Sequence, residues 1–334
     1  MRPLLAAAAL AVALVVAASA GSAPRTPQNG RIILTSETGN DYQAVVVNLS
    51  SDQQRLVKAA DGAPRPAISP DGKLIALNLQ GDDYQQFPPL WLVSAHGQGR
   101  RQQIGPGFGV TWSPDSRNLA FVNCTQNEGP CDQGIVILDP KHPKARHRIY
   151  SGIAGDLLWS PDGKWIAFAR YDDNAQASQL LAVRPDGSGR HVVTSDLDGD
   201  YDWSPTGTRL VFVGRTRDLY TVPVRGGEPT RITNDERGKY LPRWSADGKW
   251  IAFFAWPAND DGRVVVIDPA GHEEHFIGLG SQPVWSPTGH GLAYRSWLGV
   301  KIARPGGSGQ YFVSRETLGE DALPLAWFAE GRCC

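Results

Sequence analysis

The sequence predicts an all-β protein, and three observations carry the prediction. Turn-forming residues are abundant and spread through an apolar chain, with 37 Gly and 25 Pro among 334 residues. One short segment recurs at regular spacing along the chain. No segment has convincing helical periodicity, whereas many short apolar runs suit buried strands. Many tight turns between short strands are typical of all-β architecture.

The recurring segment joins an aromatic or apolar residue to a tight turn and a second apolar run. Its copies are ISPDGKLIAL from Ile68, WSPDSRNLAFV from Trp112, WSPDGKWIAFA from Trp159, WSPTGTRLVFV from Trp203, WSADGKWIAFF from Trp244, WSPTGHGLAYR from Trp285 and a truncated WFAEGR from Trp327. The spacings are 44, 47, 44, 41, 41 and 42 residues. A period of this length indicates a repeat architecture in which each copy is one structural unit.

Each unit predicts four short antiparallel strands. The first ends at the aromatic residue, and in the Ser-Pro-Asp-Gly turn Pro presets φ, Asp bonds the local backbone and Gly takes the positive φ. The second strand, such as 165–169, is apolar on both faces. A variable loop, a third strand such as 264–267, a Gly-rich turn such as 185–189 and a fourth strand such as 191–194 complete the unit. Four strands per period make one blade of a β-propeller.

The W-S-P-D-G-x-x-I-A-F hairpin resembles the TolB-type, WD-like β-propeller repeats. The resemblance covers the chain from about Arg31 onward, and its six good copies make the match specific. It implies a closed ring, because TolB proteins are similar in closing their ring with strands from both termini. Those proteins have six blades and a preceding α/β domain, and this sequence departs on both points. The resemblance therefore does not carry Tol-Pal binding onto loops that do not match.

The repeat spacing predicts seven four-stranded blades, with six blades as the alternative. The six intervals from Ile68 to Trp327 average about 43 residues, and residues 31–334 divide into about seven such units. Residues 31–60 suit strands two to four of a unit, and residues 324–332 suit the first strand of the same unit. Pairing these N- and C-terminal strands would close the ring and remove two sheet edges. A single propeller domain over 31–334 leaves no room for a separate catalytic domain.

The N-terminal segment predicts export. Arg2 precedes an unbroken apolar run over 4–17, and Ala18-Ser19-Ala20 has the small-x-small pattern of a signal peptidase site. The run is too short to span a bilayer, and no later segment reaches the roughly 18 apolar residues of a membrane helix. We expect a signal peptide over 1–20, cut after Ala20, a leader over 21–30 and a periplasmic or secreted location. An uncleaved anchor is the alternative.

Charge and composition narrow the classes of partner. The formal net charge is −1, which lacks the strong basic footprint of proteins that bind nucleic acid. Hydrophobic residues make up 41% of the chain and charged residues 20%, as in folded domains that bury a sizeable core. We therefore expect a soluble monomer with no nucleic-acid partner and no membrane span.

The variable loops between second and third strands share one face with the loops that lead into each first strand. We call this the loop face, and such surface loops commonly carry binding residues. The candidates for binding on it are Asp82, Asp83, Asp172, Asp173, Asp260, Asp261, Arg215 and Arg243. A rim of both charges suits a protein or envelope component as partner. Bound Ca²⁺ is an alternative role for the carboxylates, and simple turn formation is another.

The sequence contains no G-x-S-x-G elbow, no H-E-x-x-H and no phosphate-binding glycine loop, so it favours a non-enzymatic binding platform. The alternative is a lyase or hydrolase with a metal in the central channel, because ligands from separate blades would leave no local motif. The candidates for the channel mouth precede the first-strand aromatics and are Asp156, Asp200, Asp202 and Gln282.

Four Cys in an exported protein suggest disulfides. Cys124 and Cys131 lie in one inserted loop around Gly129-Pro130, and we expect them to pair, with two free thiols as the alternative. A bridge of this kind would stabilise the fold by about 2 to 3 kcal/mol. Cys333 and Cys334 could pair with each other, with another chain or with nothing, and the sequence does not choose.

Overall fold

The computed structural model describes residues 31–38, 41–48, 53–57, 67–78, 89–95, 101–125, 132–172, 177–256, 262–314 and 323–328. Every regular element in these ranges is a β-strand, which confirms the all-β prediction. No helix within them could cross a membrane. The predicted signal peptide, the leader, Cys131, Cys333 and Cys334 lie outside these ranges, so the statements about them stay predictions.

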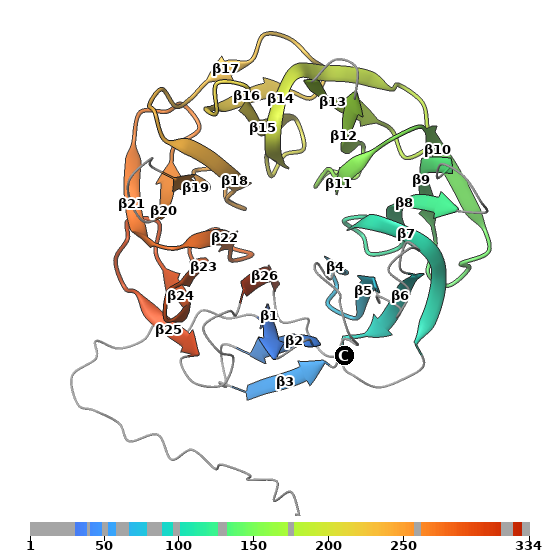
Figure 1. Ribbon diagram of the computed structural model, residues 1–334, viewed down its shortest axis with the longest axis horizontal. Coiled ribbons are helices and arrows are strands. Elements are labelled where there is room, and N and C mark those ends of the chain that lie inside the picture. The colour runs from blue at the N-terminus through green and yellow to red at the C-terminus, as the bar shows by residue number, and fades with distance from the viewer. Residues whose placement is uncertain are drawn as a thin grey trace, which may run out of the picture.

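The strands form antiparallel sheets arranged as a ring (Figure 1). Blade 1 contains β26 (Leu323–Phe328), β1 (Arg31–Thr38), β2 (Asp41–Asn48) and β3 (Gln53–Val57). Blade 2 contains β4 (Ala67–Ile68), β5 (Leu74–Asn78), β6 (Pro89–Ser94) and the first half of β7 (Gln102–Trp112). Blade 3 contains the second half of β7, β8 (Leu119–Thr125), β9 (Asp132–Leu138) and β10 (Arg146–Ser151). Blade 4 contains β11 (Gly155–Trp159), β12 (Ile166–Asp172), β13 (Ala177–Val183) and the first half of β14 (His191–Trp203). Blade 5 contains the second half of β14, β15 (Arg209–Gly214), β16 (Leu219–Pro223) and β17 (Thr230–Arg231). Blade 6 contains β18 (Gly238–Trp244), β19 (Ile251–Trp256), β20 (Arg263–Ile267) and β21 (Glu274–Leu279). Blade 7 contains β22 (Ser281–Trp285), β23 (Leu292–Ser296), β24 (Gly299–Ala303) and β25 (Tyr311–Ser314).

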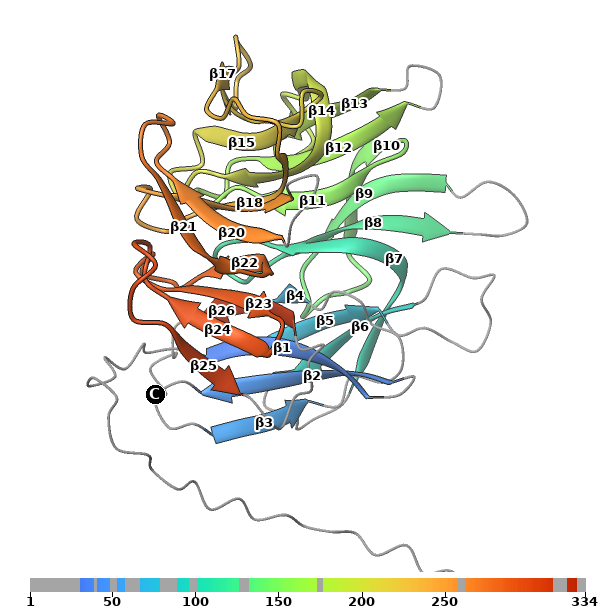
Figure 2. The ribbon, with the colours of Figure 1, turned by 60° about the vertical axis from the view of Figure 1, so that its left-hand side comes forward.

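Two long strands each serve two blades. The first half of β7 pairs with β6 and the second half pairs with β8. In the same way β14 pairs first with β13 and then with β15. Each long strand therefore carries the chain from the outside of one blade to the inside of the next, as Figure 2 shows from the side. Divided at these points, the described strands fall into seven groups of four, which are numbered as blades 1 to 7.

The ring closes through strands from opposite ends of the chain. β1 pairs antiparallel with β26, with Ile32 opposite Trp327. This pairing confirms the predicted closure. It satisfies the edges of both strands, which would otherwise expose unpaired backbone groups.

The Ser-Pro-Asp-Gly turns have the conformation that the sequence predicts. In blade 4, Gly163 has φ of 75°, and Ser160 Oγ donates to Asp162 Oδ1 at 2.7 Å. Asp162 Oδ1 also accepts from the Lys164 backbone N–H at 3.1 Å. Burial acts to raise the pKa of Asp162, but the bonds from Ser160 and Lys164 outweigh it and hold the pKa below its ordinary value. The turn is therefore a self-contained hydrogen-bonded unit.

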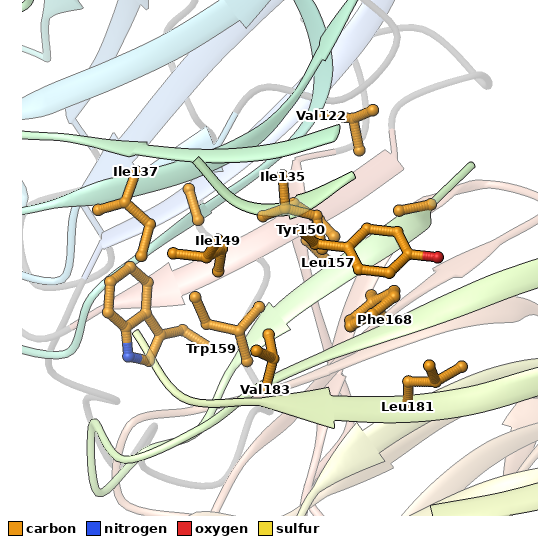
Figure 3. Close-up of a cluster of buried hydrophobic side chains, with 13 residues drawn as sticks. Val122, Ile135, Ile137, Ile149, Tyr150, Leu157, Trp159, Phe168, Leu181 and Val183 are labelled. Atoms are coloured by element: carbon orange, nitrogen blue, oxygen red, sulfur yellow. The ribbon is translucent and has the colours of Figure 1, made fainter. Parts of the chain in front are cut away.

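Neighbouring blades pack through apolar side chains, as between blades 3 and 4 (Figure 3). Ile135 and Ile149 of blade 3 lie in one buried cluster with Trp159 of blade 4. The rings of Tyr150 and Phe168 are 4.7 Å apart across this boundary. The described clusters repeat this packing at each boundary from blade 2 to blade 7, which explains why the middle strands there are apolar on both faces.

Three of the repeated tryptophans also join neighbouring blades through hydrogen bonds. Trp203 Nε1 donates to the carbonyl oxygen of Leu158 in the preceding blade at 3.0 Å. Equivalent bonds run from Trp112 to Ala67 at 3.0 Å and from Trp285 to Arg243 at 2.8 Å. Tryptophan suits this position because it combines a large apolar ring with an N–H that reaches a buried acceptor.

Replacing Trp203 with Phe tests this link between blades. The substitution keeps an aromatic ring but removes the N–H that the Leu158 carbonyl accepts. We expect the free energy of unfolding to fall by about 1 to 2 kcal/mol, measured by urea denaturation followed by tryptophan fluorescence and circular dichroism. An unchanged midpoint would show that the bond contributes nothing to stability.

Candidate functional site

The structure describes part of the predicted binding face. Asp82, Asp83, Asp173, Asp260 and Asp261 lie outside the described residues. Asp172 is the last residue of β12, and its side chain is not described. The roles of these six carboxylates stay predictions.

Arg215 lies in the turn between β15 and β16, on the loop face of blade 5. Its Nε is 3.8 Å from Asp196 Oδ1, and its guanidinium donates to the Ser195 carbonyl at 3.0 Å. Two residues further, Arg217 Nε is 3.7 Å from Asp198 Oδ2. Exposed ion pairs of this kind contribute little to stability, so both members can exchange partners at small cost. Blade 5 therefore presents a rim of both charges.

Arg243 lies on the inner strand of blade 6, next to Trp244. It is half-buried, and its guanidinium donates to the Pro242 carbonyl at 3.0 Å. Burial raises the pKa of the neighbouring Asp202, and the charge of Arg243 opposes that rise. The structure thus places Arg243 beside a predicted channel residue, closer to the turn at Ser245 than to the loop end of β18.

The four channel-mouth candidates all lie on the strands nearest the centre of the ring (Figure 1). Asp156 and Gln282 occupy equivalent positions, three residues before the blade tryptophan, with φ of 51° and 54°. Gly109 and Leu241 share this position and have φ of 62° and 50°. The strand register shifts at each of these points, so four inner strands carry a bulge. Bulges re-aim side chains and recur near functional sites.

Asp200 and Asp202 bind the backbone of the next blade. Asp200 Oδ2 accepts from the Leu241 N–H at 3.1 Å, and Asp202 Oδ2 accepts from the Trp244 N–H at 2.8 Å. Thr111 makes the same link two boundaries earlier, between blades 3 and 4, accepting from the Trp159 N–H at 3.1 Å. These side chains satisfy donors on the free edge of an inner strand, which would be costly to leave buried and unpaired.

The acidic cluster over 196–202 does not converge on one point. Two of its carboxylates face arginines, at Arg215 and Arg217, and the other two bind the backbone of β18. Among the described residues no group of three His, Cys, Asp or Glu is arranged to hold a metal ion. The cluster therefore acts as ion pairs and backbone acceptors where the structure describes it.

A buried ionic cluster, which the sequence did not reveal, fixes the loop face between blades 5 and 6. Lys239 is 0% exposed, and its Nζ lies 3.0 Å from Asp218 Oδ1 and 2.6 Å from Asp235 Oδ1. Asp218 is also buried and accepts from Arg231 and from Thr233 Oγ1. We call these five residues the Lys239 cluster.

Hydrogen bonds hold both acids of the cluster ionised. Burial acts to raise the pKa of Asp235, but bonds from Arg237 and Lys239 outweigh it and bring the pKa far below its usual range. Burial also acts to raise the pKa of Asp218, but bonds from Arg231, Lys239 and Thr233 outweigh it and hold the pKa below its usual range. Arg237 then reaches Glu274 of β21 at 2.9 Å. The loop leading into β18 is therefore tied to the β15–β16 turn and to the outer strand of blade 6.

Large apolar side chains are exposed on the loop face of blades 6 and 7. Trp256 ends β19 and is 54% exposed, and its ring packs edge-on against Phe254 at 5.5 Å. Trp297 and Leu298 form the turn between β23 and β24 and are 67% and 55% exposed. Leu279 ends β21 and is 41% exposed. We call Trp256, Leu279, Trp297 and Leu298 the aromatic rim.

The comparisons with known proteins agree with this architecture. The uncharacterized peptidase YuxL of Bacillus subtilis is 27% identical over 218 residues, which are 57% of this chain and 29% of YuxL. The chain thus spans less than a third of that relative. The crystal structure of TolB from Acinetobacter baumannii matches with a TM-score of 0.55 and 18% identity, covering 89% of this chain and 82% of TolB.

An enzyme shares the fold as well. An oligogalacturonate lyase from Vibrio parahaemolyticus matches with a TM-score of 0.64 and 15% identity, covering 84% of this chain and 88% of the lyase. At such identities these likenesses establish the fold alone. The TolB beta propeller domain matches residues 105–301, which is more than half of the chain. The chain therefore belongs to the TolB beta propeller domain family.

Proposed function

We propose that this protein is an exported, non-enzymatic platform that binds another protein or an envelope component on its loop face. The aromatic rim is the observation that carries the proposal. Its two tryptophans are more than half exposed, although each carries a large apolar surface. Exposed apolar groups of this size mark interaction sites, and tryptophan is enriched among the residues that contribute most to binding.

The surroundings of the rim support this use. The ion pairs of Arg215 and Arg217 border it on blade 5 and supply the polar margin that a protein interface needs. The Lys239 cluster holds the intervening loop in place, so the surface is organised before a partner arrives. The predicted acidic loops at 82–83, 172–173 and 260–261 and the proposed Cys124–Cys131 bridge would extend the same face.

The sequence and the family support the proposed location and partner class. The predicted signal peptide supports a periplasmic or secreted site of action, and a fold shared with TolB is compatible with an envelope role. A lyase or hydrolase with a metal at the centre of the ring would be the competing function. It would need ligands that the described inner strands do not bring together.

A binding experiment with matched variants tests the proposal. The purified protein is used to capture partners from an envelope extract, and the candidate identified is purified and titrated directly. Trp297→Ala/Leu298→Ala should weaken that affinity about tenfold or more, because central aromatic contacts commonly contribute 2 kcal/mol or more. Replacing Asp172, Asp173 and Asp260 with Asn should weaken the affinity further, because the charge attraction to the partner is lost.

Phe276→Ala is the matched control. Phe276 is 55% exposed but lies in the middle of the outer strand β21, away from the loop face. We expect this variant to bind as the wild type does. Equal affinity of the Trp297→Ala/Leu298→Ala variant and the wild type would rule out the aromatic rim as the binding surface.

A further inference from the structure

A strongly basic surface lies on the circumference of blades 2 to 4, on the side opposite the loop face. We define the basic edge as Arg101, Lys141, Lys144, Arg146, Arg148 and Arg190, all of which are exposed. Ten residues, 139–148, hold four of these cations against the single carboxylate of Asp139. With Asp186 as the other neighbouring acid, six fixed positive charges face two negative ones. The net charge of −1 therefore hides a local excess of cations.

Contacts between three blades bring these residues together. Gln102 Nε2 donates to the Pro140 carbonyl at 3.3 Å, which places the start of β7 and Arg101 beside the turn over 139–145. His147 Nε2 is 3.4 Å from the Asp186 carbonyl oxygen, which places β10 beside the turn over 184–190. β10 is the outermost strand of blade 3, as the green strand at the rim of Figure 1 shows.

Several of the cations are held in fixed positions by uncharged partners. Arg146 donates to the carbonyl oxygens of Ile104 and, at 3.2 Å, of Pro143. The Arg190 guanidinium lies over the Tyr150 ring, 5.4 Å from its centroid. Neither arginine, nor Lys141 or Lys144, has a carboxylate within 4.0 Å among the described residues. All four residues are nevertheless exposed, so a ligand can reach their charges from solvent.

We propose that the basic edge binds a linear anionic polysaccharide. Arg146 and Arg148 are alternate residues of one strand, so their Cα atoms lie about 6.6 Å apart on the same face, with the Arg146 guanidinium beside Gly105 of β7 and that of Arg148 beside Gly134 of β9. Lys141 and Lys144 lie in the turn that leads into this strand, and Arg190 of blade 4 adds a cation beside Tyr150. A row of separated cations fits a chain of regularly spaced carboxylates or sulfates better than it fits one small anion. Arginine also binds planar oxyanions with two parallel hydrogen bonds.

The exposed side chains favour a polymer in water over a lipid bilayer. Proteins that bind a membrane surface combine cations with aromatic or aliphatic groups that enter the lipid. The exposed tryptophans described here lie on the opposite face, in blades 6 and 7, and Val192 is the one large apolar side chain exposed close to the basic edge. Single-stranded nucleic acid is also a poorer fit, because its binding sites stack bases on exposed aromatic rings.

Titration of the full chain with a heparin oligosaccharide tests the inference. We expect binding at 50 mM salt whose affinity falls steeply as salt is added, because bound cations release counterions from the polymer. Lys141→Glu/Lys144→Glu should lower the affinity about tenfold or more and reduce the slope of log affinity against log salt by about 2. Both lysines are exposed, and their ammonium groups make no hydrogen bond or ion pair among the described residues, so the fold should be unaffected.

The matched control is Arg225→Glu/Lys249→Glu, which makes the same change in charge at exposed turns of blades 5 and 6. It should alter heparin affinity less than twofold, and Trp297→Ala/Leu298→Ala should leave it unchanged. These variants therefore test the basic edge independently of the aromatic rim. No heparin binding by the wild type, an equal loss in the control, or tighter binding to phosphatidylglycerol vesicles than to heparin would each overturn the proposal.

Discussion

Replacing Lys239 with methionine should lower the free energy of unfolding by about 3 to 5 kcal/mol. Methionine preserves much of the side-chain volume but removes the ammonium group that lies between Asp218 and Asp235. Asp218 is 1% exposed, so its carboxylate would stay buried with part of its compensating charge missing. Breaking a buried ion pair from one side typically costs this much. Urea denaturation at pH 7 measures the loss.

The matched control for Lys239 is an exposed lysine that also contacts an aspartate. Lys164 Nζ is 3.1 Å from Asp162 Oδ2, and its side chain is 74% exposed. Lys164→Met should change the free energy of unfolding by less than about 0.5 kcal/mol, because exposed ion pairs contribute little. If both variants lost similar amounts, the burial of the Lys239 cluster would not determine its contribution.

The same cluster predicts how stability depends on pH. The folded pKa values of Asp218 and Asp235 lie below those of an unfolded aspartate, about 3.9. Their contribution is therefore complete above that unfolded value and is lost as the pH falls below it. In Lys239→Met both pKa values should move toward the ordinary one, so the gap in stability between wild type and variant should narrow from pH 6 to pH 3. A constant gap would contradict the pKa assignment.

Replacing Gly280 with alanine should also be strongly destabilising. Gly280 leads into blade 7 with φ of 150°, and a Cβ there would lie 1.9 Å from the Arg295 carbonyl oxygen. The backbone of blade 7 would have to shift, since the obstructing atom belongs to a paired strand. We expect a loss of about 3 kcal/mol or more in the free energy of unfolding, or failure to accumulate as folded protein.

Gly163→Ala separates the clash from the backbone strain. Gly163 has φ of 75°, yet a Cβ at this position would meet nothing within 4 Å. Only the left-handed backbone conformation then opposes the substitution, and we expect a loss of about 1 kcal/mol. Similar losses in the two alanine variants would show that the close approach of Gly280 to Arg295 is unimportant.

The repeat made most of the fold predictable from the sequence. The spacing of Trp112, Trp159 and the later copies located the blades, and the Ser-Pro-Asp-Gly segments located the turns between first and second strands. The truncated copy at Trp327 identified the strand that pairs with β1. These features are local and recur, so every copy strengthens the same interpretation.

The candidate site was less predictable because its features depend on contacts between blades. Lys239 resembles any surface lysine in the sequence, and its burial arises only when the β15–β16 turn meets the start of β18. The bulges at Asp156, Leu241 and Gln282 are not visible in residue type, although Gly109 at the equivalent position was a signal. The basic edge is visible in the sequence at 139–148, but the net charge of −1 over the whole chain conceals it.

A structure of the protein with its captured partner would test the central claim most directly. The account predicts that the partner covers Trp256, Trp297 and Leu298 on the loop face, with the Lys239 cluster unchanged beneath it. A partner seated on the opposite face, with Trp256 and Trp297 still exposed, would contradict the account. So would a metal ion held at the centre of the ring with a small substrate beside it, which would instead identify an enzyme.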